Sequence, residues 1–97
     1  MTKGEQREMS DLASTLRTRL QDLAPSALEI HDDSAEHVGH AGAAGGGGHF
    51  SVLIVSNAFR GISRLERHQK VLARVSDLLP HPIHALSIKA LAPEEFS

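Results

Sequence analysis

The sequence predicts a single small α/β domain of the α+β kind, with elements in the order α-β-β-α-β-α. Two segments repeat apolar residues at the spacing of a helix, three shorter segments have the pattern of strands, and a Gly-rich stretch separates the first two strands. A chain of 97 residues is long enough for one core and too short for two. We therefore expect residues 1–97 to form one domain.

The first predicted helix covers residues 5–23. Its apolar residues Leu12, Leu16 and Leu20 follow one another at steps of four, which places them on one face of a helix. Pro25 follows closely and favours an end to the helix, because the residue before a proline is biased away from helical geometry.

Two strands are predicted next, at residues 27–32 and 49–56. The first alternates Leu28 and Ile30 with polar residues, as in a short strand at the edge of a sheet with one buried face. The second is a nearly continuous apolar run rich in β-branched residues, which indicates a central strand. Between them, residues 34–48 include four consecutive glycines, so we expect a loop that is mobile without a ligand.

The second half of the chain predicts a helix over residues 63–79, a strand over 83–90 and a short final helix from Pro93. Ser63 and Glu66 have the spacing of a capping box at a helix N-terminus. In the strand, alternation assigns His84 to the same face as Leu86 and Ile88.

These elements predict a three-stranded mixed sheet in the order first, second, third. The first two strands are joined as an antiparallel hairpin, and the helix between the second and third permits a parallel, right-handed crossover. We expect the two long helices to cover one face of the sheet.

Composition excludes several classes of function. The net charge of −2 gives no overall positive field towards nucleic acid or anionic lipid, and the absence of cysteine removes thiolate chemistry. We find no nucleophile elbow or phosphate loop, and adjacent Asp32 and Asp33 fall on opposite faces of a strand, so we expect a protein that is not an enzyme. No signal peptide, transit peptide or membrane span is evident, which favours a cytoplasmic protein.

Histidine is the unusual feature, with seven in a chain that has no cysteine. The predicted hairpin loop and the start of a parallel third strand lie at the same end of the sheet, and we expect several histidines to cluster there. Imidazole is a good ligand for zinc and for iron. The histidines in question are His37, His40, His49, His81 and His84.

Separated motifs in this sequence resemble the BolA-like family. They are the stretch His49 to Ser56, then Phe59, Gly61, Arg67-His68 and Ile83-His84-Ala85-Leu86, with Asp32-Asp33-Ser34 leading into the loop.

The resemblance implies a fold like the class II KH domain and a partnership with a monothiol glutaredoxin, in which the two proteins share a [2Fe-2S] cluster together with glutathione. It assigns His84 as the strand ligand and His37 as the loop ligand, with His40 as a rival for the loop position. From its place at the start of a strand, His49 is predicted either to donate a hydrogen bond to a ligand of the site or to pack at the strand edge. Because the chain has no thiolate, such a site needs a partner that provides one.

Other interpretations stay open beside this one. Zinc bound by the histidine cluster alone would need no partner. A KH-like fold also suggests a small DNA-binding transcription regulator, and a basic stripe on the second long helix could contact phosphates, although three charges would give only weak, salt-sensitive binding. The stripe consists of Arg67, Lys70 and Arg74.

The remaining histidines are predicted to have no ligand role. We interpret His31 and His81 as surface residues. His68 falls at the centre of an apolar arc on the second long helix, which predicts a buried structural histidine. The arc comprises Leu65, Val71, Leu72, Val75 and Leu79.

Overall fold

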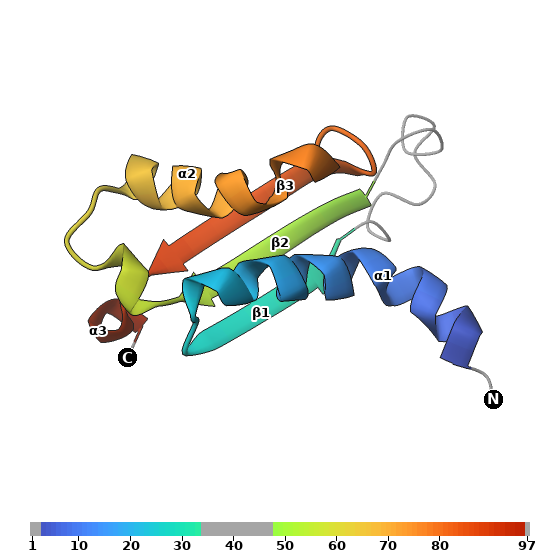
Figure 1. The fold of residues 1–97 in the computed structure, drawn as a ribbon, viewed down its shortest axis with the longest axis horizontal. Coiled ribbons are helices and arrows are strands. Elements are labelled where there is room, and N and C mark those ends of the chain that lie inside the picture. The colour runs from blue at the N-terminus through green and yellow to red at the C-terminus, as the bar shows by residue number, and fades with distance from the viewer. Residues whose placement is uncertain (1–2, 34–47, 97) are drawn as a thin grey trace.

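The computed structural model describes residues 3–33 and 48–96, with side chains from Leu12 onward in the first helix. The elements follow the predicted order α-β-β-α-β-α (Figure 1). They are helix α1 (Lys3–Leu20), strand β1 (Ala27–Asp32), strand β2 (Gly48–Val55), helix α2 (Arg64–Val75), strand β3 (Ile83–Leu91) and helix α3 (Pro93–Phe96). The predicted mobile loop lies outside the described residues, except that Gly48 begins β2.

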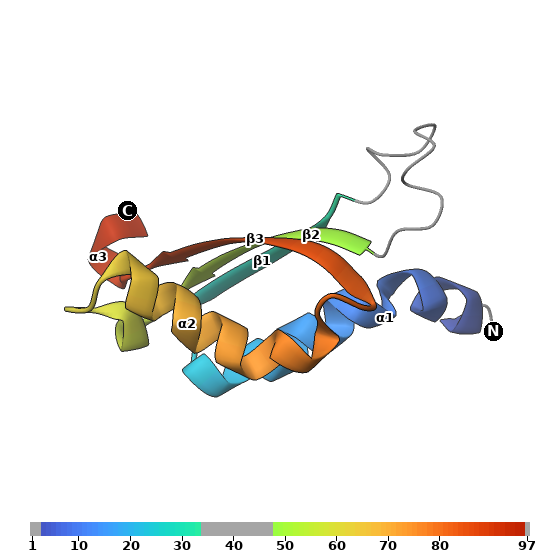
Figure 2. The ribbon, with the colours of Figure 1, turned by 90° about the horizontal axis from the view of Figure 1, so that it is seen from above.

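The sheet has the predicted topology. Its strand order is β1-β2-β3, with β1 antiparallel and β3 parallel to the central strand β2. Both α1 and α2 lie on one face of the sheet, and the other face is free of them (Figure 2). The starts of β2 and β3 therefore lie at one end of the molecule, beside the end of β1.

Helix α2 begins as the sequence predicts and ends earlier. Ser63 accepts a hydrogen bond from the Glu66 amide at 3.1 Å, and Glu66 accepts one from the Ser63 amide at 3.0 Å, which completes the capping box. Regular geometry stops at Val75, whose φ of −132° is not helical, and a 3-10 turn over Ser76–Leu78 follows. None of the described helices is long and apolar enough to cross a membrane.

The core lies between the helices and the covered face of the sheet. Alternate residues of β2 point into it, and Phe59, in a short 3-10 turn after β2, is fully buried there. The one buried polar residue within the described part is Ser56, whose hydroxyl donates to the Leu23 carbonyl and accepts from the Ala58 amide. The buried apolar residues of this core are Leu16, Leu20, Leu23, Phe50, Val52, Ile54, Phe59, Val71, Val75 and Ile83.

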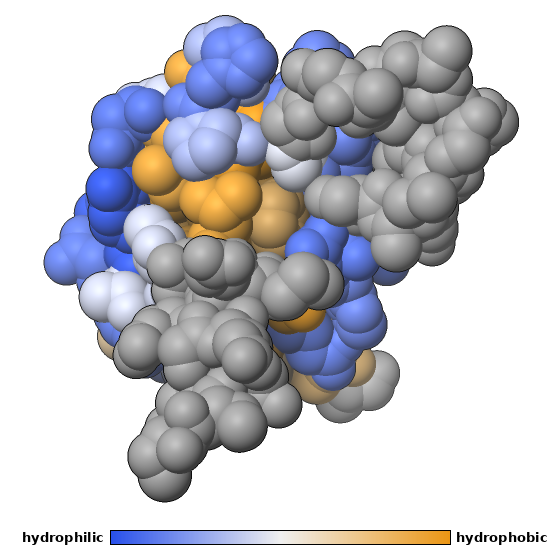
Figure 3. Space-filling view, turned by 90° about the vertical axis from the view of Figure 1, so that its right-hand side faces the viewer, coloured by the Kyte–Doolittle hydropathy of each residue, from blue (hydrophilic) through white to orange (hydrophobic). Residues whose placement is uncertain are grey.

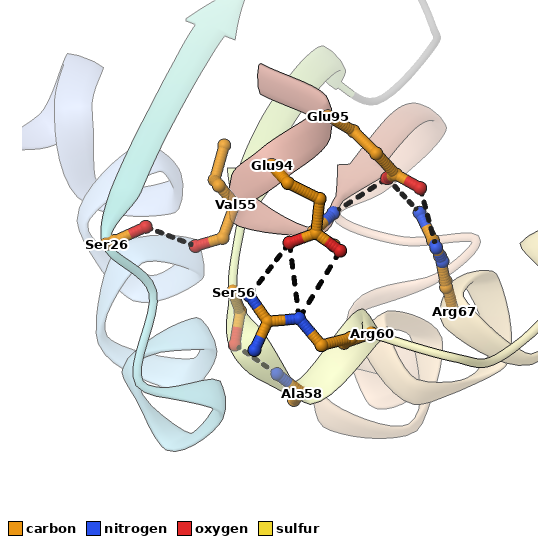
Figure 4. A network of polar contacts seen from close by, with 9 residues as sticks. Ser26, Val55, Ser56, Ala58, Arg60, Arg67, Glu94 and Glu95 are labelled. Atoms are coloured by element: carbon orange, nitrogen blue, oxygen red, sulfur yellow. Dashed lines mark hydrogen bonds and ion pairs between the residues drawn. The ribbon is translucent and has the colours of Figure 1, made fainter. Parts of the chain in front are cut away.

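Helix α3 is held to the rest of the domain by two ion pairs (Figure 4). Arg60 contacts Glu94 at 2.8 Å, and Arg67 contacts Glu95 at 2.6 Å. Glu95 also accepts a hydrogen bond from the Ala92 amide at 2.8 Å, so one carboxylate both caps the helix and binds α2.

The Glu95 contacts predict a loss of stability in acid. The hydrogen bond from Arg67, followed by that from Ala92, lowers the pKa of Glu95 from 4.5 to about 2. Because the folded state has the lower pKa, this carboxylate contributes its full stabilisation above about pH 4.5 and loses it as the pH falls towards 2. We expect the melting temperature of the wild type to exceed that of Glu95→Gln at pH 6, and the difference to shrink as the pH falls towards 2. A difference that is the same at both pH values would contradict this role.

Candidate functional site

His84 lies in a bulge at the start of β3. Gly48 pairs with Ile83 and His49 pairs with Ala85, so β3 has one extra residue between the two pairs. Ile83 is fully buried and His84 is exposed. The prediction that His84 lies on the same face of the strand as Leu86 and Ile88 was wrong, because the bulge interrupts the alternation on which it rested.

The bulge places His84 beside His49 of the central strand. The two ring centroids are 5.3 Å apart and the rings are tilted by 44°. Metal–nitrogen bonds of about 2.0–2.1 Å put the rings of two imidazoles on one tetrahedral metal at about this separation, roughly 5 Å. The two imidazoles are thus close enough to bind a single metal ion.

The other predicted members of the cluster are not part of this pair. His37 and His40 lie outside the described residues. His81 is exposed in the turn before β3. His31, predicted as a surface residue outside the cluster, is exposed on β1 with its Nε2 3.8 Å from Glu29. Within residues 3–33 and 48–96, no group of three or more His, Cys, Asp or Glu side chains could hold a metal ion. The described part of the chain therefore offers an incomplete ligand set.

Both apolar and hydrophilic residues contribute to the described surface around this end of the sheet. Figure 3 views the molecule from the side where β2 and β3 begin and shows an apolar patch beside hydrophilic residues. On the open face of the sheet, a hollow of about 230 Å³ lies among His31, Ser51, Leu53 and Lys89. Neither long helix covers this face.

His68 is only half-buried, and the apolar arc assigned to it was wrong in part. Leu65 is 66% exposed, whereas Val71 and Val75 are fully buried. Leu65 therefore lies on the solvent-facing side of α2, and sequence periodicity alone does not fix the rotation of the helix about its axis.

The predicted basic stripe is largely neutralised by intramolecular contacts. Arg67 has a side chain only 13% exposed and donates to the carbonyls of Ile62 and Ala90, each at 3.1 Å, besides its pair with Glu95. Arg74 forms an ion pair with Asp22 at 2.9 Å. Lys70 alone in the stripe is exposed and has no such side-chain contact with the described residues.

The acidic partners of these arginines were missed by the sequence analysis. Glu95 is 28 positions from Arg67 and Asp22 is 52 from Arg74, so no local spacing connects them. The only available signal was the pair of acids after Pro93, which the sequence indicated as a first helical turn and not as a partner for α2.

Comparison with known proteins decides the family. The sequence profile described as BolA-like protein matches residues 20–95. The chain is a member of the BolA-like family. BolA-like protein 1 of Bos taurus is 42% identical over 84 residues, which cover 86% of this chain and 60% of the bovine protein. This BolA-like chain thus spans less than two thirds of that relative.

Further comparisons agree with this assignment. The structure of BolA1 from Arabidopsis thaliana matches with a TM-score of 0.73 at 36% identity, over 88% of this chain and 95% of that one. A protein of Haemophilus influenzae named DNA-binding transcriptional regulator BolA is 34% identical over 78% of this chain and 71% of its own length. The predicted α+β fold is confirmed, and BolA-like proteins are non-enzymatic.

Proposed function

We propose that this BolA-like protein pairs with a monothiol glutaredoxin and shares a [2Fe-2S] cluster with it, in iron–sulfur or iron homeostasis. His84 is the ligand from the folded sheet, and His37 is the ligand from the preceding loop, with His40 as its alternative. The glutaredoxin and its glutathione provide the thiolates. The cluster is cargo of the complex and does not reside in the isolated chain.

One observation carries the proposal: the bulge exposes the His84 imidazole at the end of the sheet, beside His49. A ligand at such a position is rigid and accessible to a partner, because its backbone belongs to a paired strand. The absence of cysteine from the chain supports the partner requirement, since these imidazoles alone leave a cluster short of thiolate ligands. The His49 ring, on the neighbouring strand, lies beside the His84 ring.

A second candidate function, DNA-binding regulation, is favoured by the name of the Haemophilus relative. The contacts of the basic stripe weigh against it here. Two of its three cations already pair with carboxylates of the same chain, so few charges remain for phosphates. We therefore rank cluster sharing first.

Mixing the protein with a cluster-loaded monothiol glutaredoxin tests the proposal. We expect a 1:1 complex on size exclusion, with a visible absorption and circular dichroism spectrum of the histidine-ligated type in place of the all-thiolate type. His37→Ala should weaken this change, with partial rescue by His40, and the double change at both positions should remove it.

Metal analysis of the purified protein distinguishes zinc binding by the histidines alone from cluster sharing with a glutaredoxin. Stoichiometric zinc together with an unchanged glutaredoxin spectrum would overturn the cluster proposal. Little zinc and a shifted spectrum would support it.

A further inference from the structure

A groove runs between α2 and the outer edge of β3, away from the histidine pair. It has a volume of about 680 Å³, and aliphatic side chains contribute to its lining, among them Ile62, Ile88 and Ala90. Charged side chains line it together with these aliphatic ones, and the cluster site does not account for a recess at this position.

The strand that borders the groove has an unpaired edge within the described part of the chain. β3 pairs only with β2, through backbone groups such as the Leu91 carbonyl, which accepts from the Ser56 amide. Because these groups alternate along a strand, those of Leu86, Ile88 and Ala90 point to the outer edge. The bond from Arg67 to the Ala90 carbonyl agrees with this direction. The outward amides and carbonyls of Leu86 and Ile88 remain available to another strand.

Charges along the groove are unbalanced. Among the residues that line it, Arg67 and Glu95 neutralise each other. Arg64 and Lys89 also line it, both are exposed, and neither side chain forms an ion pair or a hydrogen bond with the described residues. The groove is therefore locally positive although the whole chain carries a net charge of −2.

We propose that this groove binds an extended acidic peptide segment of a partner protein, which adds to β3 as a fourth strand. The backbone of the segment pairs with Leu86 and Ile88. Alternate side chains of an added strand face opposite sides, so apolar ones enter the groove beneath α2 and acidic ones lie on the side of Lys89. Arg64 attracts a further acid near the end of the segment. The proposal is independent of the cluster function.

The groove favours a peptide over single-stranded nucleic acid. Its lining contains no phenylalanine, tyrosine or tryptophan on which a base could stack. Free strand amides and carbonyls pair with another peptide backbone, and nucleic acid has no matching ladder of such groups.

Fluorescence anisotropy with the full chain tests the proposal. The probe is a fluorescein-labelled nonapeptide in which Val and Asp alternate, long enough at about 3.3 Å per residue to span the edge from Leu86 to Ala90. We expect saturable binding, with amide shifts at Leu86 and Ile88 in nuclear magnetic resonance spectra. Arg64→Glu combined with Lys89→Glu should weaken binding about tenfold. Lys70→Glu, a single charge reversal on α2 outside the groove, should change it less than twofold.

A chemical control uses the unaltered protein. Methylating the amides of the peptide that face β3 should abolish binding, whereas methylating the alternate amides should not. Equal binding of a Val–Lys peptide, no loss in the double variant, insensitivity to methylation, or absence of binding at millimolar peptide would each overturn the proposal. Tighter binding of a nine-nucleotide oligo(dT) than of the peptide, with shifts at the same amides, would assign the groove to nucleic acid instead.

Discussion

Replacing His84 by alanine is expected to abolish the histidine-type spectrum of the complex with cluster-loaded glutaredoxin. The bulge in β3 fixes this imidazole at the open end of the sheet, and the only neighbouring imidazole within the described residues belongs to His49 of the central strand. A loop histidine can be replaced by a neighbour on the same loop, but a ligand fixed by strand pairing cannot. Visible circular dichroism of the mixed proteins measures the loss.

Two controls separate ligation from folding. His84 is exposed, so its removal should change the free energy of unfolding of the isolated protein by less than about 0.5 kcal/mol. His31→Ala, at an exposed histidine on β1, should leave the spectrum of the complex unchanged. If His84→Ala forms a complex with the wild-type spectrum, the proposed ligand is wrong.

Phe59→Ala is expected to have the largest effect on stability. Phe59 is fully buried and is the largest of the fully buried side chains among the described residues. Deleting a buried phenylalanine side chain costs about 3–5 kcal/mol, from the lost transfer free energy and from the cavity that remains. Small domains are stable by only about 5–15 kcal/mol, so this change removes a large part of the total. Urea denaturation of both proteins gives the difference.

Phe96 provides the matched comparison. It is the same residue type, but it is 46% exposed in α3, and Phe96→Ala should cost no more than about 0.5 kcal/mol. Similar losses for the two substitutions would show that the core is not centred where the structure places it.

The strands were predictable because their patterns are local. The bounds of β1 are those expected from alternation, and β2 is shifted by one residue from its predicted range. The capping box also depends on two residues three apart, and it begins α2 where expected. Sequence reasoning therefore sufficed for the fold and for the placement of the third strand.

The parts that failed depend on tertiary structure. A bulge depends on the register between two strands, and the residues around His84 contain no local pattern that predicts it. The acidic partners of Arg67 and Arg74 come from elements distant in the sequence. The cations on this helix were therefore predicted to be exposed, whereas in the folded chain two of the three form ion pairs. The predicted loop ligand His37 lies outside the described residues and stays a prediction.

The outer edge of β3 bears on how the protein behaves when concentrated. Unpaired edges invite copies of the same chain to join and aggregate, and natural proteins oppose this with charges on or near the edge strand. If two copies paired through β3, each would bring its own Lys89 and Arg64 towards those of the other. At one end of the edge, the Ala90 carbonyl already accepts a hydrogen bond from Arg67. Like charges thus disfavour self-association on the same surface that attracts an acidic strand. Raising the salt concentration, which screens this repulsion, should bring the protein closer to aggregation.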